Sequence, residues 1–83
     1  MASFYPDLYQ TALNHLIRAR EDAGLSRAEL AERFNQPEAF VASFESGDRL
    51  LDPAEFIAIA RAIGVDPYEL LKKAEHGGPQ DDG

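Results

Sequence analysis

The chain has few side chains of the kinds that build catalytic or metal-binding sites. Cysteine is absent, which excludes disulfides and thiolate zinc sites, and the two histidines, His15 and His76, stand alone. Adjacent acids such as Glu21 and Asp22 are expected on a solvated helix face, and no serine, histidine and aspartate are spaced as a nucleophilic triad. A glycine-rich phosphate loop is also missing. We therefore expect no enzyme, no metal and no cofactor.

Charge limits the kinds of partner. Fifteen acidic residues outweigh eight basic ones, giving a net charge of −7, and this field repels a phosphate backbone at long range. A local basic patch can still bind, because screening near physiological salt acts over only ~8 Å. No segment is apolar enough to span a membrane, and residues 1–10 lack the pattern of a secretory signal. We expect a cytoplasmic protein with no membrane partner.

Helix start and stop signals predict an all-α chain. A capping box at Ser26 and Glu29 opens the second helix, Asp7 is expected to cap the first, and Pro37 to occupy the first position of the third. The five predicted helices span residues 8–23, 27–34, 37–46, 53–63 and 67–74.

The domain organisation follows from these helices. Residues 1–75 are expected to form one domain, and residues 76–83 a flexible acidic tail, because the tail has no apolar residue to bury. Within the domain, residues 26–46 contain two short helices separated by the tight turn FNQP. This is the arrangement of a helix-turn-helix.

Positions spread over the first four predicted helices and the turns after them strengthen this interpretation. They are Ile17, Arg20, Gly24, Leu25, Ser26, Glu29, Leu30, Ala31, Phe34, Val41, Glu45, Gly47, Arg49 and the run IARAIGV at residues 59–65. In order and spacing they resemble the lambda-repressor-like, xenobiotic-response-element (XRE, Cro/C1-type) family over residues 13–71. The resemblance implies a five-helix, DNA-binding transcription regulator, whose homodimer lays the third helix of each subunit in the major groove of double-stranded DNA.

The resemblance also indicates which side chains would contact DNA. They match family positions that touch base edges or hold the phosphate backbone: Arg27, Gln36, Glu38, Ala39, Ala42, Ser43 and Arg49. In this chain Glu38 can accept a hydrogen bond from cytosine, the alanines can touch a thymine methyl group, and Ser43 can bind a phosphate.

A second hypothesis follows from what the predicted third helix lacks. Bidentate contacts with guanine need arginine or lysine, and contacts with adenine need asparagine or glutamine, and none of these is expected on its outward face. The chain would then be a protein-interaction module on the same fold, such as an antitoxin, an antirepressor or a regulatory subunit, with a basic protein as partner. Its candidate contacts are Glu38, Phe40, Glu45, Asp48, Asp52 and Glu55.

Structural roles are the alternative for several charged side chains. The two arginines among the candidate DNA contacts can be solvated or paired within the chain. Arg33 can pair with Glu29, four residues earlier on the same helix. Family members often pair the positions that match Arg20 and Glu45, so an ion pair that stabilises the fold is expected there.

Aromatic side chains also admit two interpretations. Phe44 is expected in the core, whereas Phe40 matches a partly exposed position and can contribute to an apolar protein-binding patch. Phe4, Tyr5 and Tyr9 lie outside the resemblance. They either pack against the fifth helix or form part of a dimer interface.

Overall fold

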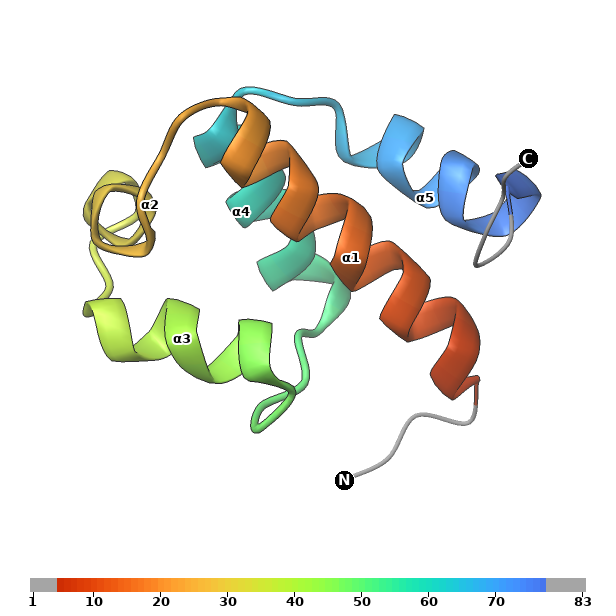
Figure 1. Ribbon diagram of the computed structural model, residues 1–83, viewed down its shortest axis with the longest axis horizontal. Helices are drawn as coiled ribbons and strands as arrows, with labels where there is room; N and C mark the ends of the chain where they lie inside the picture. Colours follow the sequence, from red (N-terminus) through yellow and green to blue (C-terminus); the bar gives the residue numbers. More distant parts are fainter. Residues whose placement is uncertain (1–4, 78–83) are drawn as a thin grey trace.

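The computed structural model describes residues 5–77, which form a bundle of α-helices (Figure 1). The helices are α1 (Pro6–Asp22), α2 (Arg27–Arg33), α3 (Glu38–Ser46), α4 (Pro53–Ile63) and α5 (Pro67–Gly77). The all-α class and the number and order of the expected helices are therefore confirmed. None of the described helices is long and apolar enough to cross a membrane.

Two reciprocal capping boxes fix where α2 and α4 begin. The Ser26 hydroxyl accepts from the Glu29 N–H at 3.0 Å, and the Glu29 carboxylate accepts from the Ser26 N–H at 2.8 Å. Asp52 and Glu55 repeat the arrangement at 2.7 and 3.0 Å. Each box satisfies two backbone N–H groups that a helix start otherwise leaves without partners.

The predicted starts of α1 and α3 are wrong in detail. α1 begins at Pro6, with Tyr5 rather than Asp7 at the N-cap position and with no side-chain cap. Proline tolerates this, because it has no N–H that needs a partner in the first turn. Pro37 is itself the N-cap of α3 in an extended conformation, so the helix starts one residue later than predicted.

α5 is longer than predicted. It continues to Gly77 instead of ending near Ala74. Ala74 is buried, with 3% of its surface exposed, so its turn of α5 gains packing that the sequence pattern did not indicate. His76 thus belongs to a helix and not to the predicted tail, and residues 78–83 of that tail lie outside the described residues.

α1 and α4 occupy the middle of the bundle (Figure 1). α5 packs along α1 on one side, and α2 and α3 pack against each other on the other side. α2 also contacts α4, which helps to attach the helix pair to the rest of the molecule.

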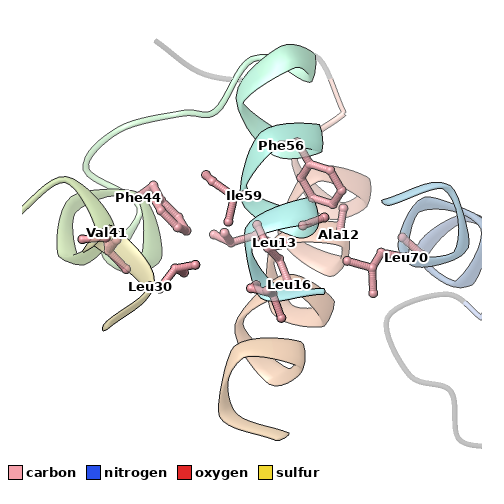
Figure 2. Close-up of a cluster of buried hydrophobic side chains, with 13 residues drawn as sticks. Ala12, Leu13, Leu16, Leu30, Val41, Phe44, Phe56, Ile59 and Leu70 are labelled. Carbon is pink, nitrogen blue, oxygen red and sulfur yellow. The ribbon is translucent and has the colours of Figure 1, made fainter. Parts of the chain in front are cut away.

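The core joins side chains from all five helices (Figure 2). Leu13 and Leu16 of α1 and Ile59 of α4 are each 1% exposed and lie at its centre. Leu30 of α2 and Phe44 of α3 reach the same centre from the helix-turn-helix. The core therefore fixes the position of the two helices on which the candidate contacts lie.

Candidate nucleic-acid interface

A tight turn joins α2 to α3. Asn35 has a φ of 59°, the left-handed conformation that asparagine tolerates better than most residues. The Gln36 N–H then donates to the Ala31 carbonyl at 3.0 Å, which satisfies one of the last carbonyls of α2. This turn and the shared core set the orientation of α3 relative to α2.

α3 has a buried face and an outward face. Val41 and Phe44 are 0% and 1% exposed, so both belong to the core, as predicted for Phe44. The four candidate contacts of α3 lie on its other faces: Glu38 and Ala39 are exposed, and Ala42 and Ser43 are half-buried. The outward face carries one carboxylate and no basic side chain, as the sequence indicated.

The Ser43 hydroxyl already has an acceptor within the helix. It donates to the Phe40 carbonyl at 2.8 Å. A phosphate oxygen needs a donor, so Ser43 would have to give up this bond in order to hold a phosphate.

Glu45 links three parts of the chain through one carboxylate. Its two oxygens accept from Nε and Nη2 of Arg20 at 2.6 and 3.1 Å, and its Oε1 also accepts from Nε of Arg27 at 2.9 Å. Arg20 in turn donates from Nη1 to the Leu25 carbonyl at 2.7 Å. The expected ion pair between Arg20 and Glu45 is confirmed. Glu45 was also a candidate contact in the protein-interaction hypothesis, but its side chain is only 5% exposed.

Arg49, in the loop after α3, is also paired within the chain. Its Nη1 and Nη2 donate to the two carboxylate oxygens of Glu55 at 3.1 and 2.7 Å. Its guanidinium lies 4.5 Å from the centre of the Phe40 ring, which is a cation–π distance. Phe40 is half-buried and packs edge-on between Phe34 and Phe44. Arg49 thus covers part of the apolar surface that was predicted for Phe40.

The remaining candidates lie around this helix pair. Gln36 is exposed in the turn, and Asp48 is exposed after α3. Gln36, Phe40 and Arg49 line one shallow depression beside α4. The suggested pair between Arg33 and Glu29 does not form. Arg33 donates instead to the Ala62 carbonyl at 3.0 Å and so ties α2 to the end of α4.

The electrostatic surroundings of Arg27 and Arg49 are acidic. The hydrogen bond to Glu45 raises the pKa of Arg27, and the charges of Glu45, Glu38 and Glu21 add to the rise. The hydrogen bond to Glu55 likewise raises the pKa of Arg49. Both guanidinium groups stay charged. Each is paired with a carboxylate, whose negative charge would repel an approaching phosphate.

An apolar groove, which the sequence did not reveal, lies between the start of α1, the start of α4 and the end of α5. It has a volume of about 480 Å³, and its lining includes Leu8, Leu51, Phe56, Leu71 and Tyr9. Tyr9 also accepts a hydrogen bond from the Leu51 N–H at 3.0 Å. Periodicity alone could not find the groove, because its residues come from segments more than forty positions apart.

No metal site is evident in the part of the chain that the structure describes. Within residues 5–77, no three histidine, aspartate or glutamate side chains are grouped so that they could hold an ion. His15 is half-buried and His76 is exposed.

Comparison with known proteins gives a consistent result. The sequence pattern of the helix-turn-helix family matches residues 16–70, which span α2 and α3. Among solved structures, the chain is similar to an "XRE-family like protein" from Pseudomonas syringae pv. tomato str. DC3000, with 46% sequence identity and a TM-score of 0.79. The match covers 82% of this chain and 83% of the other. None of the curated proteins matches the chain.

Proposed function

Because the chain belongs to the XRE (Cro/C1-type) family of helix-turn-helix DNA-binding regulators, we propose that it acts as a homodimer that binds double-stranded DNA mainly through the phosphate backbone. The observation that carries this proposal is the chemistry of α3. Its outward face offers Glu38, two alanines and Ser43, so it has little with which to read bases. Backbone contacts and DNA shape then supply most of the affinity.

The apolar groove is the proposed site of dimerisation. Leu8 and Leu71, which are 46% and 43% exposed, stand beside the hollow, so the same patch contains both protruding side chains and a depression. A two-fold interface requires such a self-complementary patch. Leu51 lies in the loop between α3 and α4, so the groove adjoins the segment that follows α3. The occupant of the groove is therefore a second copy of this chain.

Substitutions that place a charge in the groove test the dimer. Leu8→Glu and Leu71→Glu should each give a monomer by light scattering at concentrations where the unmodified chain is a dimer. Tyr68→Glu changes another exposed, large hydrophobic residue that does not line the groove, and this variant should remain dimeric. Asp52 and Glu75 also line the groove in each copy, so like charges would lie near each other at the interface. Added salt screens their repulsion and should therefore tighten the dimer. A monomeric unmodified chain would refute this interface.

DNA binding is tested by fluorescence anisotropy with a duplex from the protein's own promoter and a scrambled duplex, each at low and physiological salt. The proposal predicts submicromolar, promoter-selective binding that weakens with salt. Ala42→Lys should strengthen binding, because it adds a cation to the outward side of α3, whereas Asn14→Lys adds the same charge on α1 and should have a smaller effect. If Ala42→Lys left the affinity of an established DNA complex unchanged, this result would contradict the placement of α3 in the major groove of DNA.

The second candidate function is a protein-interaction module with a basic protein partner. It is favoured by the exposed acids Glu38 and Asp48, which have no basic side chain paired with them within residues 5–77. Absence of DNA binding even at low salt, where attraction to phosphate is strongest, would support this candidate over a DNA regulator.

A further inference from the structure

Arg27 and Arg49 both pair with carboxylates, but they present their donors differently. Arg27 uses its Nε to bind Glu45, and no hydrogen bond from either of its Nη groups is found within residues 5–77. Arg49 uses both Nη groups to bind Glu55. A guanidinium holds four of its five N–H donors on the Nη groups, and these form the fork that grips a phosphate. Arg27 therefore keeps this fork available, and Arg49 does not.

We propose that Glu45 is a positioning residue that holds Arg27 by its Nε and directs its Nη fork to one phosphate of the DNA backbone, while Arg49 is chiefly structural. The inference rests on the proposed DNA-binding function. It assigns to Arg27 the main backbone contact at the start of α2, and to the buried Glu45 the role of fixing its geometry.

The buried side of Glu45 makes this positioning rigid. Arg20 is 8% exposed and donates hydrogen bonds to both carboxylate oxygens of Glu45. These bonds restrict rotation of the Glu45 side chain. The Arg27 side chain is 52% exposed, so it is held by the buried Glu45 on one side and is open to solvent on the other. A side chain that is already ordered loses less conformational entropy when it binds a phosphate.

The local charge also distinguishes the two sites. Two guanidinium groups and one carboxylate meet at Glu45, which leaves one positive charge in excess. The pair of Arg49 and Glu55 is neutral. Glu38 and Glu21 act on Arg27 through space, but both are exposed and are therefore screened by salt.

The experiment measures the affinity of the full chain for the promoter duplex across a salt series. Arg27→Ala should lose at least about tenfold and flatten the salt dependence, because it removes a charge-assisted bidentate contact. Arg27→Lys should lose nearly as much, because lysine keeps the charge but lacks the Nε that Glu45 holds. Arg49→Ala tests the asymmetry and should lose clearly less affinity than Arg27→Ala, because both Nη groups of Arg49 are already bound to Glu55.

Glu45→Gln tests the anchor directly, with folding monitored by circular dichroism. Alone it should weaken DNA binding, and added to Arg27→Ala it should cause no further loss, since it acts through that residue. Additive losses, or full affinity of Arg27→Lys, would overturn the positioning role. Equal losses for Arg27→Ala and Arg49→Ala would overturn the asymmetry. If the unmodified chain binds no duplex, the proposed function fails and the inference fails with it.

If Glu45→Gln unfolds the chain because Arg20 loses its partner, the lysine variant still decides the question. Arg27→Lys leaves the pair between Arg20 and Glu45 in place, so its folded state is expected to persist. A loss of affinity in this folded variant supports the positioned fork, and retained affinity rejects it.

Discussion

At the scale of single residues, hydrogen bonds set the pKa values of the two glutamates in the capping boxes, Glu29 and Glu55. The backbone N–H and hydroxyl of Ser26 lower the pKa of Glu29. The guanidinium of Arg49 and the backbone N–H of Asp52 lower the pKa of Glu55. Both carboxylates therefore favour the folded state only while they are ionised.

The acid stability of the protein should depend on these two groups. A lowered folded pKa gives stabilisation that is fully present above the ordinary glutamate value of ~4.3 and is lost as the pH falls through the folded pKa. The melting temperature should therefore fall as the pH drops below the ordinary glutamate pKa, and Glu29→Gln and Glu55→Gln should each make that fall smaller. Glu32→Gln, an exposed substitution on α2, is the control. If the melting temperature of both variants fell at acid pH as steeply as that of the unmodified chain, this would contradict the role of Glu29 and Glu55 in acid stability.

At the scale of elements, short helices depend on their ends. α2 has only seven residues, so few of its backbone N–H groups have partners inside the helix. The Ser26 box supplies two of these bonds, and the Arg33 side chain supplies a further tie to α4. The helix that carries Arg27 is thus held from both ends.

Ser26→Ala should destabilise the domain by about 1 kcal/mol, since it removes the N-cap acceptor. Urea unfolding measures the change. Ser26→Thr retains a hydroxyl at the same position and should recover most of the loss. A Ser26→Ala protein as stable as the original chain would mean that tertiary packing alone holds the start of α2.

At the scale of the whole molecule, one small core holds both the scaffold and the helix-turn-helix. Phe44 is 1% exposed and contacts the centre where α1 and α4 meet (Figure 2). A chain of this size has a free energy of unfolding of only about 5–10 kcal/mol. Loss of one large core side chain therefore threatens the entire fold.

Phe44→Ala should lower the free energy of unfolding by about 3–5 kcal/mol, through lost burial and the cavity that remains. Phe40→Ala should cost less, because Phe40 is only half-buried. Chemical denaturation followed by circular dichroism compares the two. Equal losses would show that Phe44 is not the central side chain that its burial indicates.

The sequence by itself determined the features that depend on local chemistry. The capping box at Ser26, the order of the helices and the assignment of Phe44 to the core all follow from residues near one another in the chain, where periodicity and turn preferences act. The pair between Arg20 and Glu45 was available only through the family resemblance. The helix ends were less well predicted, because α5 extends past Ala74 and α1 begins at Pro6, with Tyr5 rather than Asp7 at its N-cap position.

Only the tertiary structure decided which charges are available. Arg27 and Glu45 are 18 positions apart, and their hydrogen bond depends on the angle at which α3 packs against α2. Burial turned Glu45 from a candidate protein contact into an anchor, and the turn after α3 placed Arg49 over Phe40. Residue types specify what a side chain can bind. Long-range packing specifies which of its donors and acceptors remain free to bind, and local patterns carry no information about that packing.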